Sequence, residues 1–377
     1  MVAHPPRHRV VALALLQRIR GGEWPLGGAL PAELELAKAY AVGRSTVREA
    51  MRSLESLGWV ERRRGAGTFV RQREAPEAGR IFVGLVVAHL DDIRLAGTLG
   101  GLEEVLHDAG VRLEVRATHD VPEAETMAVE ALRREGAAGV LLEPAPGWPS
   151  RSYLRRCLAE GFPVACLDRY DPEVPLPHAA ADQRQGALHL ARHLLAGGHR
   201  RIAFIIPRSF PTTAIAQRID GYRRALAEAG VAQEPRLLVQ LQGALQEPVD
   251  DALRTAINGL MALRDSERPT AWMCPNDEVA AWVLSLLKEA GVHVPEECSV
   301  TGFDDLPYAR RLDPPLTTAQ QPLDAIGRAA AEGLLLALRD PSAPPAQITL
   351  PVRLVVRGST TRAPHAVRAA SAERPGA

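Results

Sequence analysis

The chain has 377 residues, of which 46% are hydrophobic and 24% charged, which is enough for two or three domains with buried cores. Its formal net charge is zero, but residues 1–73 hold 13 Lys and Arg against 6 Asp and Glu, whereas the remainder holds 32 against 39. A basic head on an acidic body places any affinity for nucleic acid in the head. The longest apolar run, Ile81–Leu90, is too short to span a membrane and no secretory signal is recognised, which predicts a cytoplasmic protein.

Cysteine usage and the absence of enzyme motifs narrow the function further. The cysteines are scattered and form no CxxC pair, so a zinc site or a disulfide framework is not expected. GxSxG, HExxH and GxxxxGK[ST] motifs do not occur, and the Gly97-x-x-Gly100-Gly101 run departs from the dinucleotide pattern GxGxxG. The sequence therefore predicts no enzymatic activity, no metal and no cofactor.

The first region that carries chemistry is a predicted helix centred on Gly43-Arg44-Ser45-Thr46-Val47-Arg48. One face is apolar and another carries three arginines four positions apart. The apolar positions are Val47, Met51 and Leu54, and the arginines are Arg44, Arg48 and Arg52. Arginines beside Ser45 and Thr46 suit a helix that enters a DNA major groove, since Arg bonds guanine and hydroxyls bond phosphates. The alternative is a surface helix with a solvated basic face.

A predicted β-hairpin follows this helix and favours the DNA-binding interpretation. Trp59–Arg64 and Thr68–Arg71 are short β runs around a Gly65-Ala66-Gly67 tip, with arginines on both arms. Such a ribbon suits a wing that contacts the phosphate backbone or the minor groove.

Residues 13–70 resemble the winged helix-turn-helix of the GntR family of bacterial transcription regulators. The resemblance rests on Leu30–Ala37, Arg44–Arg48, Leu57–Val60 and Gly65–Val70, in the family's order and spacing. It implies a DNA contact surface made of Glu33, Arg44, Ser45, Thr46, Arg48, Arg64, Gly65, Gly67 and Thr68. Leu34 and Gly43 stand where the family usually has Arg and Ser or Thr. Because Gly still caps a helix, helix formation is expected, and operator preference is left open.

From Ile81 onward, apolar β runs alternate with helical patterns, which predicts doubly wound α/β layers in two lobes with ligands at the carboxyl ends of strands. Among the expected elements are a helix over Thr98–Ala109 and a strand over Arg236–Gln242. Several strand ends carry polar residues, which favours a polar small-molecule cleft over isolated helix caps or turns. These residues are Asp91, Asp92, Asp168, Arg169, Asn276, Asp277, Asp304 and Asp305.

Residues 83–357 resemble the effector domain of LacI/GalR-type regulators, which share the two-lobed periplasmic sugar-binding fold. The motifs are Pro163–Arg169, Leu195–Ile202, Arg218–Tyr222, Asn276–Ala280, Val294–Asp305 and Leu316–Pro322. The resemblance and the first loop together imply ligand contacts from Asp92, Arg94, Asp168, Arg218, Asn276, Asp304 and Gln321. Carboxylate, guanidinium and amide groups suit a polyhydroxylated ligand.

Two features leave alternatives open. Arg218 could instead form an ion pair with Asp220 or Glu228 of its own helix. The first ligand loop has Arg94 and Leu95 where many LacI-type proteins place an aromatic residue, so the identity of the sugar is not carried over.

The predicted architecture is an α/β chain with a winged helix-turn-helix domain (1–72), a linker (73–80), a two-lobed effector domain (81–362) and a disordered tail (363–377). The pairing of modules resembles the arabinose-responsive repressors of Gram-positive bacteria. We predict a homodimeric repressor of carbohydrate genes whose partners are operator DNA and a sugar effector. The alternatives are a solute-binding protein without regulatory DNA binding and a regulator with a purine effector.

Overall fold

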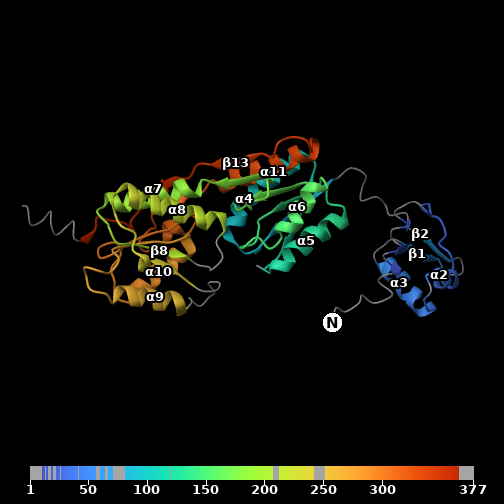
Figure 1. Ribbon diagram of the computed structural model, residues 1–377, viewed down its shortest axis with the longest axis horizontal. Helices are drawn as coiled ribbons and strands as arrows, with labels where there is room; N and C mark the ends of the chain where they lie inside the picture. Colours follow the sequence, from blue (N-terminus) through green and yellow to red (C-terminus); the bar gives the residue numbers. More distant parts are fainter. Residues whose placement is uncertain are drawn as a thin grey trace, which may run out of the picture. The chain divides into compact units, whose positions relative to one another are not determined.

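Contacts divide the chain into two compact units, Met1–Arg80 and Ile81–Ala377, called unit 1 and unit 2 below (Figure 1). The computed structural model describes residues 11–12, 14–15, 18–19, 23–25, 27–40, 42–56, 60–63, 67–70, 81–119, 121–206, 212–241 and 251–364. The predicted linker (73–80) and all but the first two residues of the predicted tail lie outside these ranges. Within them, no helix is long and apolar enough to cross a membrane.

The described part of unit 1 includes two consecutive helices that are followed by a two-stranded ribbon. The elements are α2 (Glu33–Ala39), α3 (Arg44–Ser56), β1 (Val60–Arg63) and β2 (Gly67–Val70). Val47, Ala50, Met51 and Leu54 of α3 are at most 1% exposed and pack in one cluster with Leu15. The predicted apolar stripe of α3 is therefore confirmed, and it holds the helix by one side.

The ribbon of unit 1 is an antiparallel hairpin, as predicted. β1 and β2 pair in a register that runs from Val60–Val70 to Arg63–Gly67. An additional segment that the sequence did not predict lies against the other edge of β2. There the backbone of Leu30 donates to Thr68 at 2.8 Å and an isolated bridge joins Ala29 to Phe69. The ribbon is thereby tied to the chain that leads into α2.

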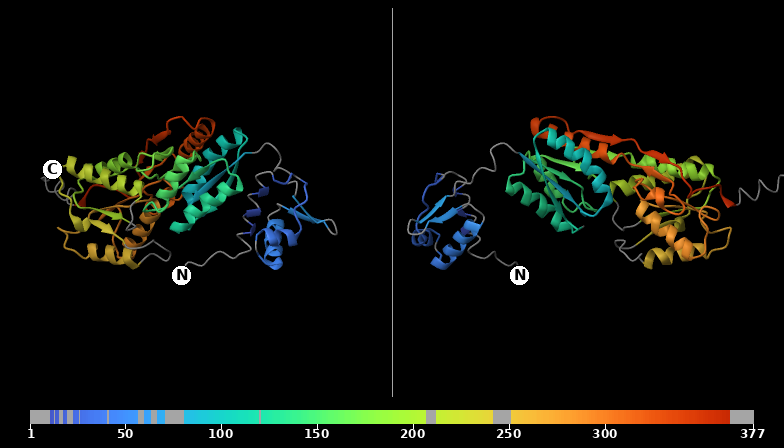
Figure 2. Two further views of the ribbon diagram at one scale, coloured as in Figure 1. Left: turned by 45° about the vertical axis from the view of Figure 1, so that its right-hand side comes forward. Right: turned by 180° about the vertical axis from the view of Figure 1, so that it is seen from behind.

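Unit 2 consists of two lobes, each with a parallel sheet between helices (Figure 2). Lobe 1 has the strand order β13-β7-β6-β5-β3-β4. Its elements are β3 (Phe82–Val87), α4 (Ile93–Asp108), β4 (Arg112–Ala117), α5 (Pro122–Glu135), β5 (Val140–Leu142), α6 (Arg151–Ala159), β6 (Val164–Leu167), β7 (His178–Ala181), α11 (Leu323–Arg339) and β13 (Gln347–Leu350). Leu85 packs with Leu102 and Leu334 under α4 and α11, while Val86 packs with Leu132 under α5. The alternation buries both faces of the sheet.

Lobe 2 has the strand order β11-β10-β8-β9. Its elements are α7 (Gln183–Ala196), β8 (Ile202–Ile206), α8 (Thr213–Glu228), η1 (Pro235–Leu237), β9 (Leu238–Gln240), α9 (Asp251–Met261), β10 (Ala271–Met273), α10 (Asp277–Glu289), β11 (Ser299–Thr301) and the short turn η2 (Ala309–Arg311). Phe204 packs against Tyr222 of α8 with ring centroids 5.4 Å apart. Trp272 belongs to a separate cluster with Leu253 and Val283 on the α9 and α10 face. Lobe 2 is therefore also buried on both sheet faces.

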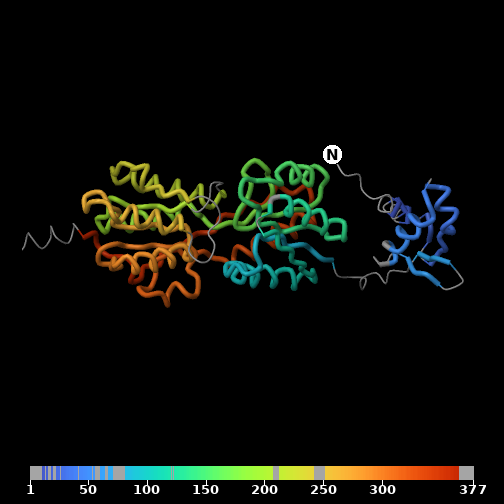
Figure 3. Tube along the Cα trace, turned by 90° about the horizontal axis from the view of Figure 1, so that it is seen from below, coloured from blue at the N-terminus to red at the C-terminus, as the bar shows by residue number. Residues whose placement is uncertain are grey.

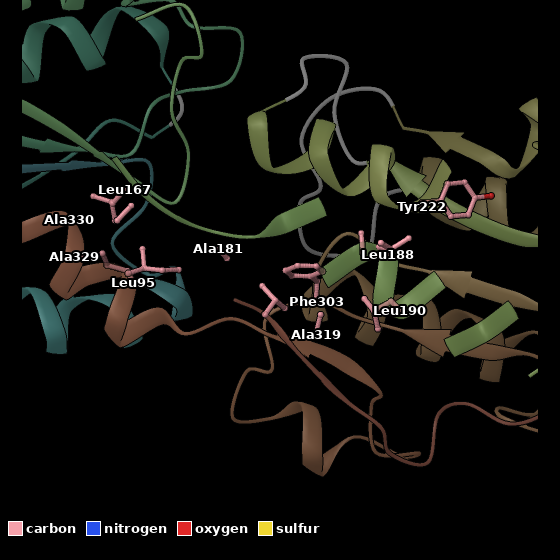
Figure 4. Packing of buried hydrophobic residues seen from close by; sticks show 14 of the residues in the cluster. Leu95, Leu167, Ala181, Leu188, Leu190, Tyr222, Phe303, Ala319, Ala329 and Ala330 are labelled. Carbon is pink, nitrogen blue, oxygen red and sulfur yellow. The ribbon is translucent and has the colours of Figure 1, made fainter. Parts of the chain in front are cut away.

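Three chain segments join the lobes (Figure 3). They lie between β7 and α7, between β12 (Thr318–Gln320) and α11, and between β13 and β14 (Arg353–Val355). β12 and β14 pair antiparallel, so two of the connections are tied together. One hydrophobic cluster runs through both lobes, from Leu167 and Ala330 in lobe 1 to Leu188 and Phe303 in lobe 2 (Figure 4). The lobes are thus connected by three crossings and a shared core.

Two predicted elements were placed wrongly. The helix expected from Thr98 begins earlier, at Ile93, because the Asp92 carboxylate caps it and accepts from the Arg94 backbone at 2.8 Å. The strand expected from Arg236 begins as the 3₁₀ turn η1, and β9 covers only Leu238–Gln240. Pro235 explains the difference, because its fixed φ favours the first position of a helical turn.

Candidate DNA-binding surface and interlobe cleft

The start of α3 presents the polar groups that the sequence singled out. Arg44, Ser45 and Arg48 are exposed and Thr46 is half-buried. Gly43 caps the helix, since its carbonyl accepts from the backbone of Thr46 at 3.0 Å and of the next residue at 3.2 Å. A helix held by its apolar side therefore offers two guanidinium groups and two hydroxyls from its first turn and a half.

Glu33 lies between arginines from two other elements of unit 1. One of its carboxylate oxygens accepts from Nε and Nη2 of Arg48 on α3, both at 3.3 Å. The other oxygen accepts from Nη2 of Arg62 on β1. Glu33 is therefore paired with two basic side chains, Arg48 from the helix and Arg62 from the ribbon, and orients both.

The ribbon carries further predicted DNA contacts. Gly67 has a φ of +113°, which favours glycine, and Thr68 is half-buried at the start of the second arm. The guanidinium of Arg63 lies 4.6 Å over the Phe69 ring, which holds one basic side chain along the ribbon. Arg64 and Gly65 lie outside the described residues.

A cleft lies between the lobes of unit 2. It consists of two neighbouring pockets, called its outer and inner parts below, with volumes of about 610 Å³ and about 150 Å³, and Arg94, Arg169 and Asn276 line both. Residues of both lobes line each part: Ala88, His89, Asp91, Asp92, Ile93, Arg94, Arg169, Asn276, Glu278, Ala281, Trp282, Asp304, Leu306 and Tyr308 outside, and Arg94, Pro146, Asp168, Arg169, Thr212, Ala214, Ile215, Arg218, Pro275 and Asn276 inside. The polar strand ends of the sequence therefore do converge on one concave site.

The lobe 1 wall is built around Arg94. Its Nη2 lies 2.7 Å from Asp92 Oδ2, and its Nη1 donates to Asp168 Oδ2 at 3.0 Å. Glu143, which follows β5, lies 3.6 Å from Arg94 and also accepts from Arg169. Burial opposes the charge of Arg94, but Asp168, Asp92 and Glu143 outweigh burial and raise the pKa of the guanidinium. The predicted residues Asp92, Arg94 and Asp168 thus form one ion-pair network.

Asp168 has an unusual backbone conformation and an incomplete set of hydrogen bonds. Its φ is +60°, a region that few non-glycine residues adopt. While Oδ2 accepts from Arg94, the buried Oδ1 has no hydrogen-bond partner among the described residues. Strained backbone and an unpaired buried acceptor are costly, and such features cluster at binding sites.

The lobe 2 wall is built around Arg218, which is 4% exposed. Its Nε donates to Gln183 Oε1 at 2.8 Å, its Nη1 donates to the carbonyl of Pro275, and its Nη2 lies 3.7 Å from Asp304 Oδ1. The guanidinium stacks 3.7 Å over the Phe303 ring, and burial lowers the pKa of Arg218. The guanidinium is thus fixed in the inner part of the cleft.

The alternative ion pairs considered for Arg218 are wrong. Asp220 pairs with Arg184 of α7, and Glu228 pairs with Arg192 and Arg224. Both acids lie on the outer side of α8, whereas Arg218 points inward.

Asp304 and Gln321 connect the lobe 2 wall to the crossover segments. Gln321 Nε2 donates to Asp304 Oδ1 at 2.6 Å, and Gln183 Nε2 donates to Gln321 Oε1 at 3.1 Å. Gln183 opens α7 after the first crossover and Gln321 follows β12 at the second. Burial raises the pKa of the Asp304 carboxyl, and Arg218 opposes that shift. A group bound at Asp304 or Arg218 would therefore touch a chain of hydrogen bonds that spans two of the three connections.

The remaining polar strand ends fall into two groups. Asn276 lines the cleft and caps α10, accepting from the Val279 backbone at 2.8 Å, which leaves its amide N–H groups for a ligand. Asp277 instead faces the interior, where it accepts from the Leu306 backbone at 2.7 Å, and Asp305 pairs with Arg357 at 2.6 Å. Asp277 and Asp305 hold the loops of the wall and do not belong to its surface.

Several residues in and beside the cleft were not predicted from the sequence. Glu143, which follows the short strand β5, bonds to Arg169, and Gln183, which follows the unpredicted strand β7, bonds to Arg218. Trp282 lines the cleft together with Glu278, one turn earlier on α10, and Tyr308 comes from the loop after β11. The helical spacing of Glu278 and Trp282 is a signal that could have found the tryptophan.

One pair of contacts joins the lobes beside the inner cleft. Tyr170, from the loop after β6, accepts at its hydroxyl from Gln217 Nε2 at 3.0 Å, and its backbone donates to Thr213 Oγ1 at 3.2 Å. The Tyr170 ring also stacks on His178 at 3.8 Å. These contacts hold lobe 1 to α8 of lobe 2.

Comparisons with known proteins agree with both halves of this description. Residues 8–70 match the family described as bacterial regulatory proteins of the gntR family, and residues 191–360 match the periplasmic binding protein-like domain. The chain is 31% identical over 362 residues to the arabinose metabolism transcriptional repressor of Geobacillus stearothermophilus, covering 94% of this chain and 98% of that protein. It is 30% identical over 352 residues to the repressor of the same name from Halalkalibacterium halodurans, covering 89% and 92%.

The fold is also similar to that of a solved structure, the transcription regulator GntR from Chromobacterium violaceum. The two are 28% identical with a TM-score of 0.61, over 74% of this chain and 99% of that chain. Since the match to the Geobacillus repressor spans nearly the whole of both chains, the protein belongs to the GntR family of bacterial transcription regulators, with a LacI/GalR-type, periplasmic-binding-protein-like effector domain.

Proposed function

We propose that this regulator represses genes of carbohydrate metabolism and that a sugar bound between the lobes of unit 2 changes its affinity for DNA. The observation that carries the proposal is the interlobe cleft, in which hydrogen-bonding groups from both lobes converge. The name of the relatives that match along nearly their whole length, arabinose metabolism transcriptional repressor, supports the same class of genes and ligand.

In the proposed DNA complex, α3 enters the major groove and the ribbon follows the backbone or minor groove. The contact residues are Glu33, Arg44, Ser45, Thr46, Arg48, Arg64, Gly65, Gly67 and Thr68, with Glu33 acting through the arginines that it holds. The exposed first turn of α3 supports this assignment. Two copies of the winged helix would read two half-sites, so the proposed operator-bound form is a homodimer.

In the proposed ligand complex, the sugar hydroxyls bond to groups from both lobes, so that binding favours the closed arrangement. The contacts are Asp92, Arg94, Asp168, Arg218, Asn276, Asp304 and Gln321. The Gln183–Gln321 amide pair and the Tyr170–Gln217 bond support a coupling between ligand contact, the crossovers and lobe closure. A coupling energy of about 1–3 kcal/mol would change operator affinity roughly 5- to 150-fold.

The proposed domain boundaries are residues 1–72 for DNA binding, 73–80 for the linker, 81–362 for effector binding and 363–377 for the tail. The contact division between Arg80 and Ile81 supports the start of the effector domain.

A thermal-shift screen of the full-length protein tests the ligand class. Pentoses, hexoses, disaccharides, sugar acids and purines are compared, since a ligand of the folded state at 100 times its Kd adds about 2.7 kcal/mol of stability. A sugar hit that disappears in Arg218→Ala and Asp304→Ala is the expected result. A hit among purines alone would favour the purine regulator, for which Trp282 and Tyr308 offer rings to stack on.

The DNA half is tested separately by measuring operator binding of Arg44→Ala and Arg48→Ala by fluorescence anisotropy. Each change removes a positive charge at the first turns of α3, so we expect about 10- to 100-fold weaker binding and a shallower salt dependence. Arg192→Ala, in an exposed pair with Glu228 of unit 2, is the matched control. DNA affinity that is unchanged in both α3 variants would favour the solute-binding alternative.

A further inference from the structure

Every arginine in the described wall of the cleft already forms an ion pair with a carboxylate of the protein. Arg94 pairs with Asp92 at 2.7 Å and with Asp168 at 3.0 Å. Arg169 pairs with Glu143, and Arg218 lies 3.7 Å from Asp304. A site built to bind an anion keeps a guanidinium fork free for it, as arginine sites for carboxylate or phosphate do. The described wall of this cleft offers no such fork.

The balance of charge in and beside the cleft is negative. Three guanidinium groups lie near four carboxylates, of which Asp92, Asp168 and Asp304 line the cleft and Glu143 pairs with Arg94 and Arg169. The outer part adds the exposed carboxylate of Asp91. A further negative charge brought inside would meet acids on both walls, and like charges placed together in a partly buried site repel strongly.

One acceptor in this set is incomplete. Asp168 uses Oδ2 for Arg94, while its buried Oδ1 has no hydrogen-bond partner among the described residues. An ionised carboxylate can only accept, so the group that completes Oδ1 must be a donor. Asp168 lines the inner part of the cleft, so a hydroxyl of a sugar bound there is a donor that meets this requirement, while Arg94 holds the carboxylate by its other oxygen.

We infer that the effector is an uncharged polyhydroxylated molecule that donates a hydroxyl to Asp168, and that the cleft rejects sugar acids and sugar phosphates. The inference rests on the proposed function, because it specifies the ligand of the same cleft. Arg94 occupies the first ligand loop, where its charge could be taken as a site for a ligand anion. Its pairing with Asp92 and Asp168 shows that this charge is already used within the protein.

The test is titration calorimetry of the full-length protein with matched ligands that differ in charge. The pairs are glucose with glucuronate, galactose with galacturonate, glucose with glucose 6-phosphate, ribose with ribose 5-phosphate and arabinose with arabinose 5-phosphate. We expect an uncharged member to bind and its anionic partner to bind at least about 100-fold more weakly, from one like charge at a few ångströms. An anionic member that binds as tightly or more tightly would overturn the inference and leave the proposed function standing. Binding of none of them would overturn both.

A variant of Asp168 tests the mechanism of selection. Asp168→Asn keeps the shape of the side chain but removes one negative charge and can turn a donor toward the ligand. We expect the affinity for the uncharged sugar to fall about 10- to 100-fold, from the loss of a hydrogen bond to a charged group. The ratio of the affinity for the uncharged sugar to the affinity for its anionic partner should fall about tenfold or more.

Asp220→Asn is the matched control, since Asp220 pairs with Arg184 outside the cleft and is 57% exposed. It should change neither the affinity nor the ratio. If Asp168→Asn lowers the melting temperature while the ratio stays at the wild-type value, Asp168 has only a structural role and the inference is wrong.

Discussion

Arg218 is the side chain whose replacement tests the inner cleft most directly. It is 4% exposed, donates to Gln183 at 2.8 Å, and stacks 3.7 Å over the Phe303 ring. Its Nη2 lies 3.7 Å from Asp304 Oδ1. Methionine has a similar length and retains the contact with Phe303, so Arg218→Met removes the charge and the donors with little loss of volume.

The expected loss of stability follows from the acid that is left behind. Removing one partner of a buried ion pair costs about 3–5 kcal/mol, because the other charge remains without compensation. Asp304 reduces this cost, since burial raises its pKa to about 6 and the carboxyl can bind a proton once Arg218 is gone. We therefore expect unit 2 to lose about 2–4 kcal/mol of unfolding free energy at pH 7.5 and less at pH 5, where Asp304 is already protonated.

Scanning calorimetry of the full-length variant at both pH values measures this loss. At roughly 2–4 °C per kcal/mol, the transition of unit 2 should move down by about 5–15 °C at pH 7.5. Arg192→Met is the control, because Arg192 is 48% exposed in its pair with Glu228 and should cost under about 1 kcal/mol. Wild-type melting of Arg218→Met at both pH values would refute the assignment of Arg218 as the buried counter-charge of Asp304.

Three further predictions concern single residues. Gly43→Ser should stabilise unit 1 by a few tenths of a kcal/mol in urea unfolding, because a Cβ at this position has space and a serine hydroxyl caps α3 better than glycine does. A loss of stability would contradict the assignment of residue 43 as the helix cap. Sugar affinity should fall about tenfold per pH unit below about pH 6, because the ionised carboxylate of Asp304 accepts from the ligand and burial raises the pKa of this carboxyl to about 6. A calorimetric affinity that does not change from pH 5 to 8 would exclude this role of Asp304. Gly101→Ala should lower the free energy of unfolding by about 1–3 kcal/mol in thermal unfolding, because its Cβ would overlap the backbone of Asp324 on α11. Gly100→Ala should cost less, because its Cβ would lie 3.4 Å from the Asp324 carboxylate. Equal losses in the two variants would argue against the contact between α4 and α11.

The residue types at the cleft could be predicted because parallel strands end at the same edge of a sheet. Asp92, Asp168, Asn276 and Asp304 each follow a predicted strand, and the structure brings all four to the cleft wall. The apolar stripe of α3 was equally readable, because a period of 3.6 residues leaves one face without charges.

The crossover connections could not be predicted in the same way. β7 has the sequence His178-Ala179-Ala180-Ala181, and alanine has a low preference for strands, so nothing marked it as part of the sheet. Gln183 comes soon after this strand, beyond Asp182, and without the strand there was no reason to place it beside Arg218. β12 and β14 are equally short and are defined by pairing with each other, which is a tertiary contact.

The side-chain directions of the neighbouring residues Asp304 and Asp305 could be learned only from the structure. Asp304 and Asp305 both have positive φ values, +118° and +61°, yet Asp304 lines the cleft while Asp305 pairs with Arg357 behind it. The two side chains point in different directions because of the backbone conformation of these residues. The Asp304–Gln321 hydrogen bond and the parallel bridge from Asp304 to Gln320 hold that conformation. Such backbone states cost about 1–3 kcal/mol each and persist only where the surroundings fix them. These bonds lie within the protein and fix the lobe 2 wall. If the proposed sugar binds in this cleft, selection among sugars depends on their fit to these fixed groups.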